Sequence, residues 1–167
     1  PQNSFRLYQN PDGPVLGTVS APILEQDGLF FKDLARTGQL LPYEDWRLPA
    51  QTRAEDLAAR LSIEEIAGLM MYSPHQMIPT LPGDPFQGSY NGKPFPESGL
   101  ERWALTDQQK AFLEQDHIRH VLVMKLESAG IAARWSNAIQ QAAEELPWGI
   151  PVNVSSDPRH GASKAKA

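Results

Sequence analysis

Apolar side chains recur at helical spacing between residues 130 and 146, and β-forming residues lie on both sides of this segment. The preceding run covers residues 118–126 and the following run covers residues 150–155. A strand, a helix and a strand in this order normally form a parallel crossover. Two parallel strands cannot bury both of their faces, so we expect the sheet to need further strands and the fold to be incomplete on its own.

Three further helices are predicted by a hydroxyl residue that is followed three positions later by Glu or Gln, a pattern in which the two side chains bind each other's free backbone amides. Helical spacing of apolar residues supports the first two of these helices. The pairs are Thr52 with Glu55, Ser62 with Glu65, and Thr106 with Gln109, and the second helix is expected to bury Ile63, Ile66, Leu69 and Met70.

Two segments show no sustained periodicity. Residues 1–50 mix Pro, Gly and short apolar runs, which favours an extended N-terminal arm over a packed unit. Residues 73–105 contain six prolines and four glycines, so we expect little regular structure there. Aromatic residues in this second segment argue against disorder and favour an ordered loop near a binding site.

The composition narrows the class of protein. Charged residues make up 21% of the 167 residues and the net charge is −5, with no basic face for nucleic acid or for an anionic membrane. No apolar stretch is long enough to span a bilayer. Cysteine is absent, which removes disulfides and thiol chemistry. The chain begins at Pro1 with no leader, which we interpret as a processed or trimmed terminus that leaves export open.

The most informative stretch runs from the predicted last strand into Asp157-Pro158-Arg159-His160-Gly161. Parallel α/β sheets bind ligands at the carboxyl ends of their strands, and this is where the strand should stop. Together with residues 53–70 and with the helix around 134–140, this motif resembles glycoside hydrolase family three, the β-glucosidase family. The resemblance covers residues 50–167.

The resemblance implies a (β/α)₈ TIM-type barrel, with residues 1–50 as the arm and residues 51–167 as the first strands and helices of that barrel. Family members are exo-acting and retaining, and two carboxyl groups flank the bond that is cleaved. The resemblance places both of these groups outside this chain, so no catalytic residue is assigned here. Ser155-Ser156-Asp157 is superficially similar to the family's nucleophile motif, but Pro158 follows it and it occurs too early in the chain.

Three substrate-binding residues follow from the same resemblance. Asp157 resembles the aspartate that binds hydroxyls of the terminal nonreducing sugar, and a carboxylate is suited to accept several such hydrogen bonds. Arg159 and His160 border the same site. The structural alternatives are a helix cap or turn for Asp157, an ion pair for Arg159 and a hydrogen-bonded structural imidazole for His160.

The expected partners are a small saccharide or β-glycoside and a complementary C-terminal polypeptide of the same enzyme, with no cofactor, nucleic acid or membrane. A homo-oligomer is left open, and a periplasmic or secreted location is favoured over the cytoplasm. One alternative is an autonomous carbohydrate-binding or protein-interaction module without catalysis. Another is a hydrolase that uses Ser155 or Ser156 with His160, although no nucleophile elbow surrounds these residues.

Three other features of the sequence are candidate sites. The segment from Asp33 to Glu44 has the outline of a calcium loop, but Ala35 cannot serve as a ligand, and an ordinary glycine turn is favoured. His117 and His120 lack the carboxylates that would complete a metal site, so no metal is assigned. Among the four tryptophans, Trp135 is expected in the core, and Trp103 beside the long loop is kept as a candidate sugar platform.

Overall fold

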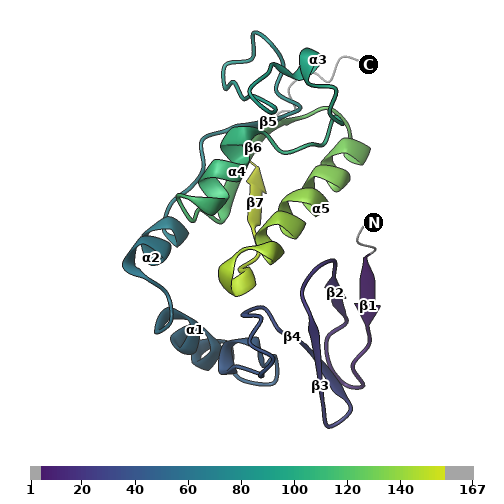
Figure 1. The fold of residues 1–167 in the computed structure, drawn as a ribbon, viewed down its shortest axis with the longest axis vertical. Helices are drawn as coiled ribbons and strands as arrows, with labels where there is room; N and C mark the ends of the chain where they lie inside the picture. The colour runs from purple at the N-terminus through teal and green to yellow at the C-terminus, as the bar shows by residue number, and fades with distance from the viewer. Residues whose placement is uncertain (1–4, 157–167) are drawn as a thin grey trace.

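The computed structural model describes residues 5–156 and shows a mixed α/β fold with three small sheets (Figure 1). The central sheet is parallel, in the order β5-β6-β7. Its strands are β5 (Gln76–Ile78), β6 (His120–Leu126) and β7 (Asn153–Ser156), and the helix α5 (Ala129–Glu145) connects β6 to β7. The predicted parallel strand-helix-strand unit is therefore confirmed. The described residues do not form a closed barrel.

The apolar core lies between this sheet and the two helices α4 (Asp107–Glu114) and α5, which flank β7 in Figure 1. Val121 from β6 and Trp135 and Ile139 from α5 are at most 1% exposed. Trp135 also donates its indole N–H to Gln109 Oε1 at 3.3 Å. The prediction that Trp135 belongs to the core is confirmed.

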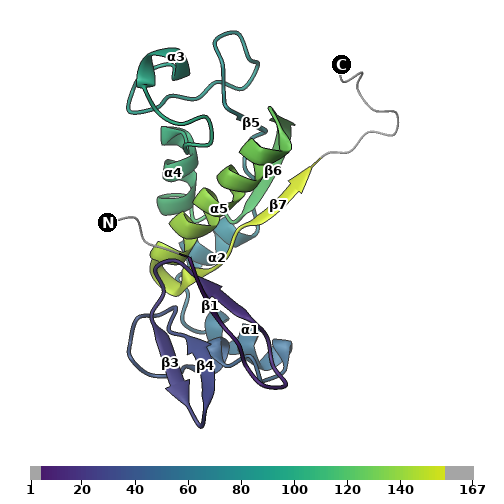
Figure 2. The ribbon, with the colours of Figure 1, turned by 90° about the vertical axis from the view of Figure 1, so that its right-hand side faces the viewer.

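The N-terminal segment contains more regular structure than an extended arm. It forms two antiparallel hairpins, which lie side by side below α5 in Figures 1 and 2. Their strands are β1 (Arg6–Tyr8), β2 (Leu16–Thr18), β3 (Ile23–Gln26) and β4 (Leu29–Lys32). Each strand has only three or four residues, which is too short for a period to emerge from the sequence.

Helix starts were predicted correctly in two of three cases. The hydroxyls of Ser62 and Thr106 accept from the amides of Glu65 and Gln109, at the starts of α2 (Ile63–Leu69) and α4. The Thr52 prediction is wrong, because α1 (Ala50–Ala58) begins two residues earlier with Pro49 as its cap. The extended backbone of Pro49 separates α1 from the preceding short helix η1 (Pro42–Glu44) without a side-chain cap.

Two other local predictions need correction. Ile63 and Met70 of the expected apolar face are 72% and 82% exposed, because nothing in the described chain covers the two ends of α2. The long loop does contain regular structure, namely β5 and the short helix α3 (Phe95–Ser98). β5 exists because β6 pairs with it, a long-range contact that the local sequence does not reveal. A further short helix, η2 (Pro147–Gly149), leads from α5 towards β7.

Candidate functional site

The carboxyl ends of β5, β6 and β7 point the same way, because the three strands are parallel. β5 and β6 end at Ile78 and Leu126, and β7 is described as far as Ser156. The predicted sugar-binding residues Asp157, Arg159 and His160 lie outside the described residues, and Asp157 follows β7 directly in the sequence. This edge of the sheet is therefore the candidate functional site.

The loop between β5 and α4 lies at this edge, at the top of Figure 1, and it is ordered by polar contacts. Buried Tyr90 accepts the Thr80 amide at 3.0 Å. The Asp107 carboxylate accepts from the amides of Asn91 and Gly92 and from the Ser89 hydroxyl. Hydrogen bonds from Gly92 and Ser89 hold the pKa of Asp107 below its ordinary value. The prediction that this loop is ordered is confirmed.

Two carboxylates at this edge are each paired with a cation. Lys125 Nζ lies 3.1 Å from Asp84 Oδ1, and the backbone amide of Leu81 together with Lys125 lowers the pKa of Asp84. Arg102 Nε lies 2.8 Å from Glu127 Oε1. Since both carboxylates already have cationic partners next to the loop, we interpret their role as holding the loop against the sheet.

The sheet face opposite α5 is open in the described chain. Tyr72 beside β6 and Met124 within it are 59% and 56% exposed. On the neighbouring strand, the Ser155 hydroxyl is buried and has no hydrogen-bond partner among the described residues. Neighbouring exposed apolar side chains such as Tyr72 and Met124 make this face a candidate contact surface. The alternative site that joins Ser155 or Ser156 to His160 depends on a residue outside the described range.

The calcium-like loop is closed by backbone amides. Asp33 accepts from the amides of Thr37 and Gly38 at 2.9 and 2.8 Å. Glu44 accepts from the amides of Ala35 and Leu41 at 2.8 and 2.9 Å. Both carboxylates therefore stabilise the turn, as the glycine-turn interpretation predicts. Within residues 5–156 no group of three His, Asp or Glu is placed to hold a metal ion.

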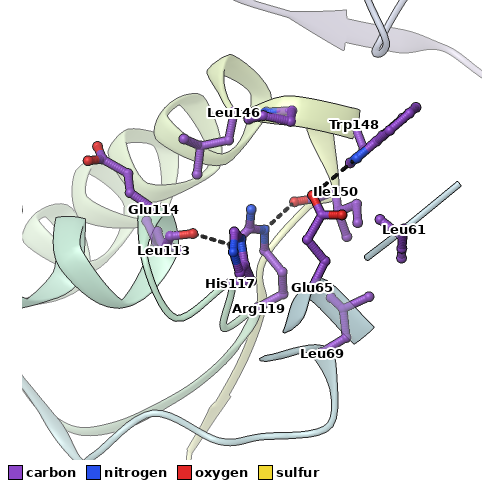
Figure 3. Close-up of a pocket in the computed structure, with 11 residues that line it drawn as sticks. Leu61, Glu65, Leu69, Leu113, Glu114, His117, Arg119, Leu146, Trp148 and Ile150 are labelled. Atoms are coloured by element: carbon purple, nitrogen blue, oxygen red, sulfur yellow. Dashed lines mark hydrogen bonds between the residues drawn. The ribbon is translucent and has the colours of Figure 1, made fainter. Parts of the chain in front are cut away.

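Sequence reasoning missed Arg119, at the amino edge of the sheet. Its guanidinium is buried and donates to the carbonyls of Leu113, Ile118 and Ile150 beside a small cavity of about 60 Å³ (Figure 3). Burial lowers the pKa of Arg119, and the nearby Glu65 carboxylate opposes this shift. Because its guanidinium binds these three carbonyls, Arg119 connects α4, β6 and the segment before β7. No signal in the sequence indicates this role.

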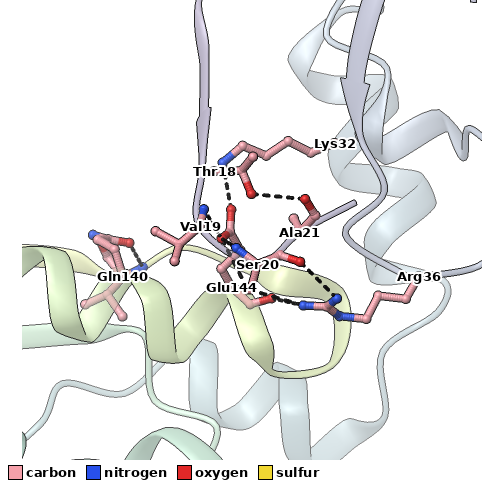
Figure 4. Close-up of polar contacts among 9 residues, drawn as sticks. Thr18, Val19, Ser20, Ala21, Lys32, Arg36, Gln140 and Glu144 are labelled. Atoms are coloured by element: carbon pink, nitrogen blue, oxygen red, sulfur yellow. Dashed lines mark hydrogen bonds and ion pairs between the residues drawn. The ribbon is translucent and has the colours of Figure 1, made fainter. Parts of the chain in front are cut away.

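Sequence reasoning also missed Glu144, near the end of α5. Its carboxylate accepts from the amides of Val19 and Ser20 at 3.0 and 2.9 Å and from Lys32 Nζ at 3.1 Å (Figure 4). Burial alone would raise the pKa of Glu144, but the two backbone amides and Lys32 lower it to about 2. Glu144 thus joins the N-terminal hairpins to the helix that carries the core.

Trp103 does not present a bare ring to solvent. It packs against the core, and the guanidinium carbon of Arg134 lies 4.5 Å from the centre of its ring. Both residues line a groove between α5 and the hairpins. His117 lies beside the cavity of Arg119, whereas His120 lies on the sheet, 3.2 Å from Asn153. The two histidines therefore do not form one site.

Comparison with known proteins identifies relatives of the chain, although no protein-family model matches it. It is 37% identical over 145 residues to a periplasmic beta-glucosidase/beta-xylosidase of Dickeya chrysanthemi. It is 32% identical over 129 residues to the "Probable beta-glucosidase C" of Aspergillus oryzae. These alignments cover 87% and 76% of this chain but only 20% and 18% of the relatives.

The chain thus spans about a fifth of the length of the curated relatives it matches. None of the helices in residues 5–156 combines the length and the apolar character that a membrane crossing requires. The first of these alignments leaves out only 22 of the 167 residues, fewer than either the hairpins (6–32) or the parallel unit (76–156) contains, so it includes at least part of both. By sequence, this chain is related to one part of glycoside hydrolases of the β-glucosidase type.

Proposed function

We propose that this chain is the N-terminal segment of an exo-acting, retaining β-glycosidase of glycoside hydrolase family three. One observation carries the proposal: in a chain similar to β-glucosidases, β7 of a parallel sheet reaches Ser156, and Asp157 is the next residue in the sequence. In this proposal residues 51–167 supply the first strands of a TIM-type barrel, and residues 1–50 precede it. The enzyme acts in the periplasm or outside the cell.

Asp157 binds hydroxyls of the terminal nonreducing sugar and so orients the glycosidic bond. A carboxylate forms charge-assisted hydrogen bonds with neighbouring hydroxyls, and fixing the ring lowers the entropic part of the barrier. Arg159 and His160 border the same sugar. The nucleophile and the acid/base belong to a complementary C-terminal part of the enzyme, which also covers the open sheet face beside Tyr72 and Met124.

Denaturing intact-mass analysis beside hydrolysis of an aryl β-glucoside tests the proposal. We expect activity only where the 18.5 kDa sequence occurs together with further polypeptide, as one chain or as a second one. A folded 18.5 kDa chain that binds sugar by itself and lacks activity in every context would instead indicate an autonomous binding module.

The role of Asp157 is tested in the active protein by Asp157→Ala. We expect kcat/KM for the aryl β-glucoside to fall about 100-fold, as for the loss of charge-assisted hydrogen bonds to the substrate. Asp116→Ala is the matched control, because Asp116 is exposed at the opposite edge of the sheet. Equal activity of the two variants would contradict the assignment of Asp157.

A further inference from the structure

The groove between α5 and the hairpins has the size of a ligand site. Its volume is about 750 Å³, within the range typical of small-molecule pockets. It follows α5 from Arg134 to Glu144, a span of eleven residues that corresponds to about 15 Å of helix. Gly17 of β2 lies on its other side. Such an elongated, open groove suits a linear ligand.

The end of the groove near Trp103 and Arg134 presents hydrogen-bond donors that have no acceptor within the described chain. The indole N–H groups of the other three tryptophans donate to protein acceptors, at Phe30 O, Gln109 Oε1 and Glu65 Oε1. Among the described residues, the N–H of Trp103 has no such acceptor and is not buried. Arg134 stacks on this ring and takes part in none of the ion pairs of residues 5–156.

Two amides continue the same stripe along α5. Asn137 is exposed, and its side chain makes no hydrogen bond within the described chain. Gln141 donates to Glu145 Oε1 at 3.1 Å, which leaves its carbonyl oxygen and one N–H for a ligand. At the opposite end of the groove the polar groups are already paired, because Glu144 and Lys32 bind each other there. The free polar groups therefore lie at the positions of Arg134, Asn137 and Gln141.

We propose that this groove is a second saccharide-binding site, which holds a linear β-linked oligosaccharide. Amide and guanidinium groups bind vicinal hydroxyls in pairs, and the exposed aromatic ring of Phe5 supplies flat apolar surface at the margin. The choice of a β-linked sugar rests on the proposed function, whereas the groove and its chemistry do not.

A protein segment is a poorer occupant of this groove than a sugar. The exposed apolar side chains of the central unit gather on and beside the sheet, at Tyr72, Met124 and Leu126. Missing protein is expected to cover that surface. Among the residues that line the groove, only Phe5 is a strongly exposed large apolar residue, at 63%, and the rest of the lining mixes apolar surface with polar side chains. A sugar, which combines apolar ring faces with hydroxyls, fits this mixture.

Calorimetric titration of the protein with cellotetraose tests the proposal, in an Asp157→Ala background that weakens binding at the sheet edge. The double variant Asn137→Ala/Gln141→Ala is expected to bind the tetrasaccharide at least ten-fold more weakly. Gln51→Ala is the matched control, because Gln51 is exposed on α1 and donates to Glu55 just as Gln141 donates to Glu145.

Equal affinity in the double variant, or no binding of cellotetraose in the Asp157→Ala background, would overturn the proposal. Hydrolysis of the aryl β-glucoside separates this result from the proposed function. With Asp157 intact, the double variant should keep kcat/KM for that small substrate within two-fold of the wild type. Loss of groove binding with normal hydrolysis would support both assignments.

Discussion

The parallel unit and the N-terminal hairpins are held together by different forces. The unit from β5 to β7 has a continuous apolar core against α4 and α5. In the hairpins and the turn after them, side-chain amides and carboxylates bind backbone groups. Asn10, Asp33 and Glu144 are the main examples. Periodic apolar packing can often be recognised in the sequence, whereas polar contacts between segments far apart in the chain cannot.

The largest effect is expected from Trp135→Ala. The side chain is 1% exposed in the centre of the core, so its truncation should lower the free energy of unfolding by about 3–5 kcal/mol. Urea denaturation measures this loss. Trp135→Phe keeps a smaller aromatic ring in the core but not the bond to Gln109, and it should lose less than half as much. A loss under about 1 kcal/mol in Trp135→Ala would contradict a core role.

Glu144 connects the two regions, and its loss should affect the hairpins most. Glu144→Ala leaves the amides of Val19 and Ser20 unpaired and should cost about 2–3 kcal/mol. Trypsin should then cut early after Lys32 and Arg36, which both contact Glu144. Glu145→Ala, one residue along the same helix, is the control. Equal resistance of Glu144→Ala and Glu145→Ala to trypsin would show that other contacts hold the hairpins in place.

Acid should loosen the same junction. The pKa of Glu144 is about 2 in the folded protein and 4.5 ordinarily, so its stabilisation is complete above pH 4.5 and is lost as the pH falls towards 2. This loss amounts to about 3 kcal/mol. Trypsin is inactive at such pH, so unfolding followed by circular dichroism measures it. Glu144→Gln should be less stable at neutral pH and should lack this component of the pH dependence.

Asn10 tests the polar contacts inside the hairpin region. Its side chain accepts the Phe30 amide at 2.7 Å and donates to the carbonyls of Pro14 and Phe30. Asn10→Ala should cost about 2 kcal/mol, because these backbone groups lose their partner. Hydrogen exchange should quicken in β1 and β4 and stay unchanged in β6. Faster exchange in β6 as well would show that the hairpins and the parallel unit unfold together.

The smallest effect is expected at the helix caps. Thr106→Ala removes the observed cap of α4 and should cost about 1 kcal/mol in urea denaturation. Thr52→Ala is its counterpart, because Thr52 lies exposed inside α1 and caps nothing. This second change should leave stability within about 0.5 kcal/mol of the wild type. Equal losses would mean that the Thr106 cap adds nothing.

Most of the parallel unit could be predicted from the sequence, because each of its signals is local or periodic. Ser62 and Thr106 start helices at the expected positions, and Trp135 lies in the core. Of the candidate site, the sequence supplied the motif at Asp157, and the fold adds that β7 runs directly towards it. The groove beside Arg134 could not be predicted, because its two sides are far apart in the chain.

The sequence by itself determined the starts of α2 and α4, the parallel crossover through α5 and the relation to β-glucosidases, because these depend on short-range patterns and on motif order. Only the tertiary structure decided the pairing of β5 with β6, the burial of Arg119 and the attachment of the hairpins to Glu144. In each of these, a polar or short segment gains its partner from a distant part of the chain. The stability of such a segment therefore depends on contacts that exist only once the chain has folded.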